Sequence, residues 1–582
     1  MTITLVEIDA NVQGDSSTTL TIGTGAKTFV LDSDQPFIAG MSVTARYDDS
    51  NDMSGTITRV RGLNVTVNVS SVNGSGSHSA WELNGDRTLY AATESYTSNS
   101  GVEYIGDIAD PGDIEQNMFS EGSTLGASKA TKGNIVFNNK DGAWDFVRKL
   151  GFKKGSLRIK QIADQTYDVP SDNVFAGNVL YPECGFDTID FSVSDRLSDL
   201  DVPAQEAVFA GTNAGPVGIE GSAGGIKGQT KPFGYGGQIL NVKAKLLNEA
   251  KNIWGVMFDY AGATDSITSF DDVKDEGLTK TKDTGVGTSG DVANLAALQA
   301  ATITSGQYAT CLAEGLYRFS GAPNGIVTCD FTHSTMTGAA IVKALIERIG
   351  LTSSDYVNST FTSVDSDNGN AQEIYVEDDS TVLRLSLQIM SGMGGYIISD
   401  TDNKIRVGLL KNPADGTSVK TFDEYSAINL TRLESKDPGK GIPPRQIKLN
   451  YRKNYTEFSD SEFAGAVTDT TRLLLGNQWR QVVGDENGKI ARKHPNAPIF
   501  EIDTHFVSEA NALTELSRQE TLRQTDRDFY QFATYDLTPL NLGDVITLQI
   551  DGRFDLSDGF KSVIVGKNIE LKKSRIVYTV WG

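Results

Sequence analysis

The chain has 582 residues, and its 52 Lys and Arg against 75 Asp and Glu give a formal net charge of −23. This excess of acids argues against a protein that grips nucleic acid along its surface, because phosphate binding needs clustered Lys and Arg, and against an electrostatic hold on an anionic membrane. A single core rarely exceeds about 250–300 residues, so the length predicts about three to five domains. The 59 Gly, the 15 Pro and an aromatic content of 8% favour strands and turns over a helical array.

The sequence shows no feature of membrane insertion or secretion. No stretch approaches the roughly 20 consecutive apolar residues of a membrane-spanning helix. The opening MTITLVEIDANVQGD lacks the basic, apolar and small-residue regions of a Sec signal. Cys184, Cys311 and Cys329 lie far apart and form neither a disulfide framework nor a C-x-x-C metal motif. We expect them to be buried free thiols in a protein made in a reducing compartment.

Residues 1–85 predict a small all-β module. Its segments rich in Val, Ile and Thr alternate as half-buried strands do, and turn signals such as Gly23-Thr24-Gly25 separate them. A Gly/Ser stretch at 73–79 precedes Trp81. The predicted strands are 18–22, 28–31, 42–47, 54–60 and 65–69.

In the next third of the chain the pattern predicts a second set of strands, followed by two segments with little signal for regular structure. A Gly-rich connection occupies 211–237. Segment 262–291 carries seven acidic and three basic residues, a net charge of −4, and we expect a mobile loop or an extended excursion there. The predicted strands are 135–138, 157–161, 174–179 and 188–193.

Helices are predicted in the second half. Apolar residues at helical spacing indicate a helix over 339–349, with Thr337 as its N-cap and Gly350 just past its end. A second helix is predicted from about 381 to 390, and a strand hairpin follows it. The strands of this hairpin are predicted at 396–399 and 404–407. The C-terminal part is predicted to be mostly strands with one helix over 509–523. Its predicted strands are 446–451, 534–537, 545–550, 561–567 and 574–581.

No enzymatic or metal-binding constellation is evident. The four histidines, His78, His333, His494 and His505, form no zinc signature, and no G-x-S-x-G elbow announces a catalytic serine. The Gly-rich run 221–230 has Ile226 where a phosphate loop needs Gly. In the run 365–370, Gly369 is fifth where a calcium loop needs Gly sixth, so a solvated turn is expected. The paired carboxylates Asp271-Asp272 and Asp378-Asp379 are expected at the surface or in caps. We therefore expect no catalytic residue, no cofactor and no metal.

Several motifs in a fixed order carry a family resemblance. They are G-N-I-V-F-N-N-K-D-G-A-W-D at 133–145 with G-S-L-R-I at 155–159, V-F-A-G at 174–177 with F-S-V-S-D-R-L at 191–197, I-K-G-Q-T-K-P-F-G-Y-G-G-Q-I-L-N-V at 226–242, and the end L-G-D-V to V-W-G at 542–582. This order resembles tail-tip, or baseplate hub, proteins of long-tailed phages and of gene transfer agents. Residues 17–84 resemble a small β-module of phage tail-fibre proteins. Segment 250–320 matches nothing in the family and suggests an insertion.

The resemblance implies a non-enzymatic virion protein with a mainly β fold and α+β segments. The expected domains are the N-terminal β-module (1–85), a first tube-type β domain (86–245), an insertion (246–324), an α/β connector (325–424) and a second tube-type β domain with one helix (425–582). Such proteins close the distal tail tube, anchor fibre or tip proteins and form part of the DNA channel. The implied partners are further copies of this chain, as a trimer or a hexamer, with tail tube and fibre proteins, and DNA in transit. Assembly is expected in the host cytoplasm.

An alternative stays open from the N-terminal module. The chain is then a virion protein that binds or depolymerises carbohydrate on the host envelope. Depolymerases usually need carboxylate pairs in an aromatic-lined groove, and aromatic residues are sparse here. Trp81 is the candidate glycan contact, although its apolar, turn-bounded setting also suits a core residue.

Overall fold

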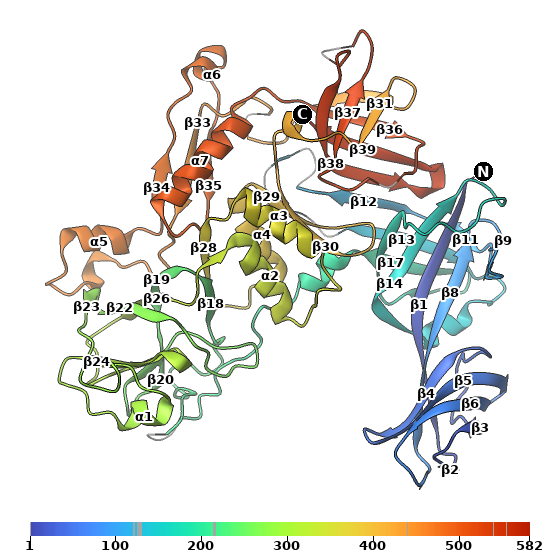
Figure 1. The fold of residues 1–582 in the computed structure, drawn as a ribbon, viewed down its shortest axis with the longest axis horizontal. Coiled ribbons are helices and arrows are strands. Elements are labelled where there is room, and N and C mark those ends of the chain that lie inside the picture. The colour runs from blue at the N-terminus through green and yellow to red at the C-terminus, as the bar shows by residue number, and fades with distance from the viewer. Residues whose placement is uncertain are drawn as a thin grey trace.

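A computed structural model describes the chain except residues 1, 120–122, 125–127, 129–130, 214–216, 439, 539 and 554–555. Strands account for 41% and helices for 16% of the chain, so the prediction of a mainly β fold with α+β segments is confirmed. Figure 1 shows a small module at the lower right, a barrel above it, a second barrel-like sheet at the top, and a mixed α/β body at the centre and left. Among the described residues, no helix combines the length and the apolar character that crossing a membrane requires.

The first barrel, barrel 1, closes around alternating apolar side chains such as Ile135, Phe137, Leu157 and Phe191, which are fully buried. Strand β1 pairs with β14, β14 with β15, and β15 and β13 with β17, all antiparallel. Its elements are β1 (Ile3–Ser16), β8 (Trp81–Ala92), β9 (Tyr96–Thr97), β10 (Glu103–Tyr104), β11 (Ile108–Asp110), β12 (Asp113–Asn117), β13 (Lys132–Asn138), β14 (Gly151–Ile162), β15 (Phe175–Val179), β16 (Glu183–Cys184), β17 (Thr188–Ser194) and the 3-10 helices η1 (Asp145–Lys149) and η2 (Arg196–Leu200).

The N-terminal module grows out of barrel 1 on two long strands. Strand β1 pairs with β8 along its length and also with β14, so it belongs to both sheets. The predicted boundary at residue 85 therefore falls inside β8, because the first 16 residues continue one strand from barrel to module. The module adds β2 (Leu20–Thr21), β3 (Gly25–Val30), β4 (Ser42–Asp48), β5 (Asn51–Arg61), β6 (Asn64–Asn73) and β7 (Ser77–His78).

The second sheet, barrel 2, is built from two stretches of the C-terminal part. Phe422, Phe532 and Tyr578 meet in its core, with ring centroids 4.9–6.1 Å apart. Its strands are β31 (Lys420–Asp423), β32 (Ile428–Leu433), β36 (Phe529–Thr534), β37 (Val545–Gln549), β38 (Phe560–Glu570) and β39 (Arg575–Trp581), with the 3-10 helices η4 (Pro413–Asp415) before them and η6 (Leu571–Lys573) between the last two.

Barrel 1 and barrel 2 share a sheet. Strand β12 leaves barrel 1 and pairs antiparallel with β38 of barrel 2, from Asp113 opposite Glu570 to Asn117 opposite Gly566. Figure 1 shows β12 running between the two barrels. Two segments about 450 residues apart in sequence thus join the barrels through backbone hydrogen bonds.

The α/β body fills the space beside the barrels. Helix α2 begins after Thr337, whose hydroxyl accepts from the Ala340 amide as predicted, and buries its apolar stripe against α4. The body contains β18 (Phe233–Gly236), β27 (Met336–Thr337), α2 (Gly338–Arg348), α3 (Asn358–Asp367), β28 (Ala371–Val376), α4 (Val382–Gly392), β29 (Gly395–Ser399) and β30 (Ile405–Leu409).

The predicted domain over 425–582 is divided in the structure. Its central part forms a separate sheet whose residues Ile447, Leu449 and Phe500 pack into the core of the α/β body rather than into barrel 2. This part comprises β33 (Gln446–Tyr451), η5 (Asp460–Glu462), α5 (Asp469–Gly476), β34 (Arg480–Val483), α6 (Gly488–Lys493), β35 (Ile499–Asp503) and α7 (Glu509–Arg523).

The expectation of a mobile loop over 262–291 is wrong for its central part. Strand β22 forms there and pairs with β26, because Lys274 is buried between Asp272 (3.1 Å) and Asp330 (2.7 Å), which offsets the acidic charge. The surrounding segment contains β19 (Gln238–Lys243), β20 (Lys245–Asn248), β21 (Ile253–Gly255), β22 (Ser269–Asp275), β23 (Leu278–Thr279), α1 (Leu295–Ala300), β24 (Tyr308–Cys311), η3 (Leu312–Glu314), β25 (Leu316–Phe319) and β26 (Val327–Thr332).

Candidate functional site

One face of the sheet that joins the two barrels is polar. Strands β17, β13, β12, β38, β39, β36 and β32 lie side by side in this order. Successive side chains of a strand point to opposite faces, and one face packs Ile135, Ile569 and Tyr578 into the barrel cores. The opposite face, called the polar face below, carries Asp190, Ser192, Asn134, Asn138, Asp113, Glu115, Asn117, Asn568, Glu570, Arg575, Thr579, Gln531 and Thr431, with Val136, Val577 and Ala533 among them.

A hollow of about 370 Å³ lies on the polar face where the barrels join. Amide side chains line part of it: Asn117 donates to Glu115 at 2.6 Å, and Gln531 donates to Thr579 at 3.3 Å. Asn429 and Asn568 complete this lining. The hollow thus combines uncharged amides with the charged side chains of Glu115, Lys567, Glu570 and Arg575.

The charged groups around this hollow are mostly paired. Glu570 accepts a hydrogen bond from Arg575, which lowers the pKa of the Glu570 carboxyl, and Lys573 lies 3.2 Å from the same carboxylate. Burial, and then the negative charge of Glu570, raise the pKa of Asp113. The cation Arg575 is therefore committed to a carboxylate and is not held ready for a phosphate.

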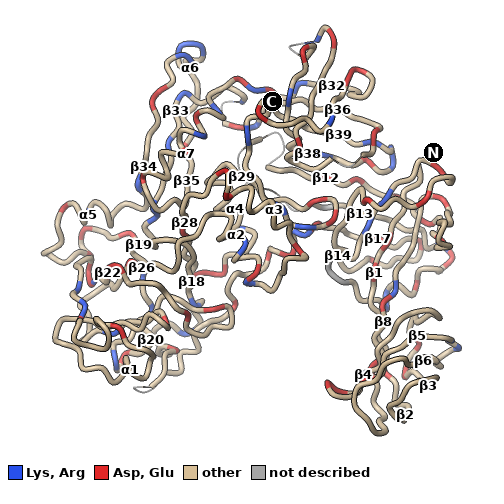
Figure 2. The backbone as a smooth tube through the Cα atoms, viewed as in Figure 1, with Lys and Arg blue, Asp and Glu red and all other residues tan. Residues whose placement is uncertain are grey.

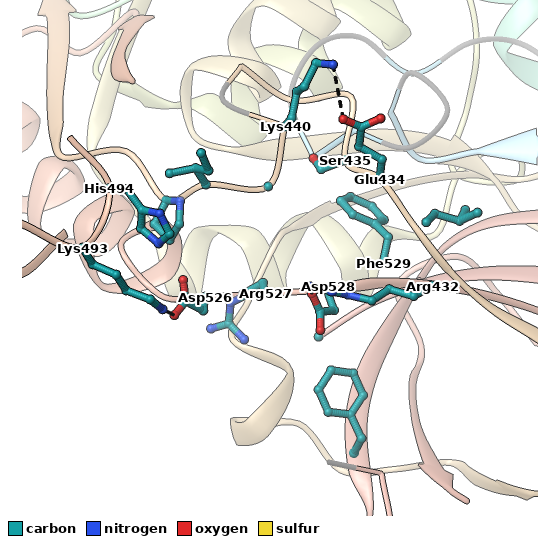
Figure 3. Close-up of a pocket in the computed structure, with 16 residues that line it drawn as sticks. Arg432, Glu434, Ser435, Lys440, Lys493, His494, Asp526, Arg527, Asp528 and Phe529 are labelled. Carbon is teal, nitrogen blue, oxygen red and sulfur yellow. Dashed lines mark hydrogen bonds and ion pairs between the residues drawn. The ribbon is translucent and has the colours of Figure 1, made fainter. Parts of the chain in front are cut away.

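A larger hollow of about 740 Å³ opens beyond the end of β36 (Figure 3). Two of its cations are paired with carboxylates, Arg432 with Asp528 and Lys493 with Asp526 at 2.5 Å, whereas Arg527 donates to the Asn412 side-chain oxygen at 3.0 Å. Lys440 lies 3.3 Å from Glu434. Paired cations bind phosphate weakly, because the neighbouring carboxylates repel the same anion. Figure 2 shows acidic and basic residues distributed over every part of the chain.

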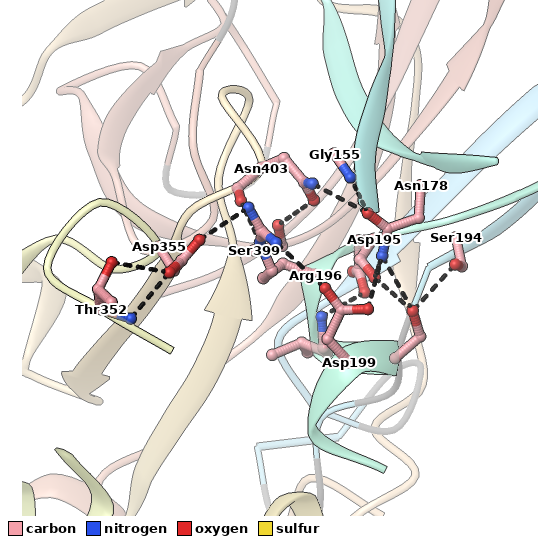
Figure 4. Close-up of polar contacts among 12 residues, drawn as sticks. Gly155, Asn178, Ser194, Asp195, Arg196, Asp199, Thr352, Asp355, Ser399 and Asn403 are labelled. Atoms are coloured by element: carbon pink, nitrogen blue, oxygen red, sulfur yellow. Dashed lines mark hydrogen bonds and ion pairs between the residues drawn. The ribbon is translucent and has the colours of Figure 1, made fainter. Parts of the chain in front are cut away.

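Polar contacts centred on Arg196 fix barrel 1 against the α/β body (Figure 4). The Arg196 guanidinium donates to the Asn403 carbonyl at 3.1 Å and contacts Asp199 and Asp355, each at 3.2 Å. Asn178 receives a hydrogen bond from Asn403 at 3.3 Å and donates to Asp199 at 3.1 Å. The Arg196 side chain is 13% exposed. These contacts are one of the polar connections between barrel 1 and the α/β body.

A buried carboxyl next to this junction anchors the start of β13. Asp195 accepts hydrogen bonds from the Thr131 amide at 3.0 Å, the Thr131 hydroxyl at 2.6 Å and the Leu197 amide at 3.0 Å. Burial raises the pKa of Asp195 to about 6. The carboxyl therefore ties the start of β13 to η2, which carries Arg196.

Trp81, the candidate glycan contact, lies in the module core and is 1% exposed. Its ring packs against Phe29 with centroids 6.0 Å apart, and its indole N–H donates to the His78 carbonyl at 3.0 Å. The ring faces are covered, so Trp81 itself offers no platform for a sugar.

The other sequence candidates lie apart from one another. His333 contacts Ser334 at 3.0 Å, His505 is buried, and His494 follows α6 at the wall of the larger hollow. Asp365 lies inside helix α3, so the turn expected at 365–370 is wrong for its first half. No strand or helix is assigned within 221–230.

Two of the three cysteines are placed as predicted. Cys311 and Cys329 are buried, whereas Cys184 is exposed on the short strand β16, so the prediction for Cys184 is wrong. Among the described residues, no group of three or more His, Cys, Asp or Glu is placed to hold a metal ion.

The polar face was not predicted from the sequence. Its residues alternate with buried apolar ones, and that alternation predicts strands without saying which strands are neighbours. The pairing of β12 with β38 has no local signal, and the amides at positions 117, 531 and 568 occur singly in segments far apart.

No protein-family model and no curated protein matches the chain. Among solved structures, the chain is similar to the 43 kDa tail protein of prophage MuSo2 from Shewanella oneidensis, with 13% identity, a TM-score of 0.35, and coverage of 82% of this chain and 95% of that chain. It is similar to a tail protein from Neisseria meningitidis, with 9% identity, a TM-score of 0.34, and coverage of 81% and 91%. It is also similar to a chain in the virion of a native gene transfer agent particle, with 11% identity, a TM-score of 0.38, and coverage of 61% and 85%.

Proposed function

We propose that this chain is a structural component of a phage tail, located at the tail tip as a baseplate hub. In this role it closes the distal end of the tail tube, anchors fibre or tip proteins, and contributes its polar face to the channel through which DNA leaves. The role requires no catalysis. The sequence motifs described above support the proposal, and the observation that carries it is the single polar face shared by two barrels.

The chemistry of the polar face suits a channel wall. DNA passing through a narrow channel would adhere to unpaired Lys and Arg. Arg575 on this face and Arg432, Lys440 and Lys493 in the larger hollow each lie next to a carboxylate, and amides line part of the centre. Carboxylates such as Glu115 and Asp190 add repulsion toward phosphate. A wall of this kind lets DNA slide without binding it.

A ring of copies would turn the polar face into a closed wall. Each chain supplies two barrels joined side by side, so three copies would place six barrels around one axis. Closed rings are favoured by strand-rich chains because they cover exposed sheet edges. We therefore propose a homotrimer, and size-exclusion chromatography with light scattering, followed by negative-stain imaging, tests it. A monomer at micromolar concentration would contradict it.

The two lateral ends of the joined sheet carry exposed apolar side chains that suit contacts between copies. At the β17 end, Tyr181 and Phe186 are 71% and 100% exposed. At the β32 end, Tyr425 and Tyr535 are 83% and 62% exposed. Burial of such groups in a head-to-tail contact stabilises association by roughly 25 cal/mol per Å².

Substitution of Phe186 with Asp is expected to shift the ring toward monomer, because a charge would be placed in the apolar contact. Leu473→Asp is the matched control, since Leu473 is 67% exposed on α5, away from both lateral ends. Light scattering should show a loss of at least half of the oligomer for Phe186→Asp and none for Leu473→Asp. Equal behaviour of the two variants would remove the β17 end from the proposed contact.

A further inference from the structure

The far end of the N-terminal module points away from barrel 1 and from the rest of the molecule (Figure 1). Strand β8 runs from Trp81 at that end to Ala92, which pairs with Leu5 in barrel 1. Strands β2 and β7 pair near the same end, and Figure 1 shows β2 at the bottom of the module, away from the body of the molecule. Residues at this end therefore lie away from the rest of the chain, where an external ligand can reach them.

Three aromatic rings meet at this end, two of them stacked and the third edge-on to both. Tyr47 lies over His78 with ring centroids 4.2 Å apart and an angle of 28° between the rings. Trp81 contacts both rings edge-on, with its centroid 5.8 Å from that of His78 and 6.3 Å from that of Tyr47. Tyr47 is 44% exposed, whereas Trp81 is 1% exposed. The buried Trp81 thus holds Tyr47 and His78 at the surface in a fixed arrangement.

Polar groups from two loops surround this aromatic platform. Asp48 accepts hydrogen bonds from the Ser50 amide at 2.8 Å and from the Asn51 side chain at 2.9 Å. These bonds, together with the nearby His78 ring, lower the pKa of Asp48, so its carboxylate stays charged. From the second loop, the Ser75 carbonyl contacts His78 Nε2 at 3.1 Å. A carboxylate, amides and carbonyls thus border the ring face.

A glycine holds the two loops together. Gly74 has a φ of +81°, and a Cβ there would lie 2.2 Å from the Asn51 side-chain oxygen and 2.5 Å from the Ser50 carbonyl. A residue with a side chain would push the loop 73–77 away from the β4–β5 turn. The close approach keeps the platform and its polar border in place before any ligand arrives, which reduces the entropic cost of binding.

We propose that Tyr47 and His78, supported by Trp81, form a binding site for a neutral saccharide. The apolar C–H face of a pyranose ring stacks on an aromatic face, and its hydroxyls are donors and acceptors that match Asp48, Asn51 and the loop carbonyls. This site replaces Trp81 as the contact surface, because the exposed ring of the cluster is Tyr47. The proposal goes beyond the structural role above and does not depend on ring formation.

Saturation-transfer difference NMR on the full chain tests the site. The probes are the methyl glycosides of glucose, galactose, N-acetylglucosamine and rhamnose at millimolar concentration. At least one should receive saturation from the wild type, and Tyr47→Ala should reduce that signal at least five-fold. Tyr47→Phe, which keeps the ring, should retain most of it.

The control is Leu63→Ala, because Leu63 is 40% exposed in the turn between β5 and β6 at the opposite end of these strands. Unchanged hydrogen–deuterium exchange in peptides from β5 and β8 of each variant establishes that the module is folded. If no probe binds the wild type, or if folded Tyr47→Ala binds as the wild type does, the proposal is wrong.

Discussion

Substitution of Arg196 with Met is expected to loosen barrel 1 from the α/β body by about 3–5 kcal/mol. The Asp199 and Asp355 side chains around Arg196 are only 6% and 19% exposed. Removal of one partner from a buried ion pair leaves uncompensated charge, and such changes typically cost about 3–5 kcal/mol. The Asn403 carbonyl would lose its donor as well. Met keeps the length and much of the apolar stem of Arg, so the loss reports the guanidinium.

Hydrogen–deuterium exchange at Ser399–Lys404, next to the Arg196 contacts, is the direct measurement. A loss of about 3–5 kcal/mol in local opening corresponds to exchange that is roughly 150- to 5,000-fold faster at protected amides. The matched control is Arg432→Met, because Arg432 is 56% exposed and pairs with Asp528 at the surface. Exposed pairs contribute about 0–1 kcal/mol. Similar exchange in the two variants would show that the Arg196 contacts do not hold the junction.

Substitution of Glu373 with Gln is expected to stabilise the protein at alkaline pH and to change little in acid. Glu373 is 1% exposed on β28 and accepts a hydrogen bond from the Tyr455 hydroxyl at 2.9 Å. Burial raises its pKa from 4.5 to about 8, against the lowering effects of Tyr455, Lys453 and Arg452. A Gln side-chain oxygen can accept the same hydrogen bond.

The stability of the wild type falls with rising pH because folding raises the pKa of Glu373, so that the folded protein holds a proton the unfolded chain has lost. Between pH 4.5 and pH 8 the unfolded chain has released the Glu373 proton while the folded protein keeps it, so stability falls as the pH rises through this range and levels off above about 8. A pKa that rises from 4.5 to about 8 lowers the free energy of unfolding by about 5 kcal/mol in total, at 1.36 kcal/mol per pKa unit. Because Gln cannot ionise, the Glu373→Gln variant does not lose this stability as the pH rises.

Urea unfolding at pH 4, 6 and 9 measures this effect. The midpoint of Glu373→Gln should match the wild type at pH 4 and exceed it by an amount that grows to pH 9. Glu377→Gln is the control, because the Glu377 side chain is 45% exposed near the same strand, where it pairs with Lys245 at 3.0 Å. If the Glu373→Gln and wild-type midpoints differ by a constant at all three pH values, Glu373 is not a buried neutral acid.

Local sequence signals predicted the elements whose packing is local. The helix over 509–523 is α7 at the predicted bounds, and Thr337 caps α2 as expected. The hairpin at 396–407 forms because Ile397 and Val407 share one buried face. These elements bury an apolar stripe that the sequence displays within a few residues.

Elements that depend on distant partners were not predictable in this way. Helix α3 is rich in Ser, Thr and Asp, a composition that is typical of a turn. It forms a helix because Phe361 and Val364 are buried on one side. Strand β22 needs the register of Asp330 to neutralise Lys274. The polar face needs β12 beside β38, which only the folded chain brings together. The apolar, turn-bounded setting of Trp81 favoured a core residue, which is observed, but nothing in the sequence marks Tyr47 as the exposed ring beside it.

Electron cryomicroscopy of the purified full chain tests the central claim most directly. The account predicts a closed ring of three copies in which the polar face, including Asn117, Gln531 and Asn568, lines an open central channel. It also predicts that Phe186 of one copy lies against barrel 2 of the next. A reconstruction in which the polar face lies on the outer surface, or is covered by a neighbouring copy, would contradict the account.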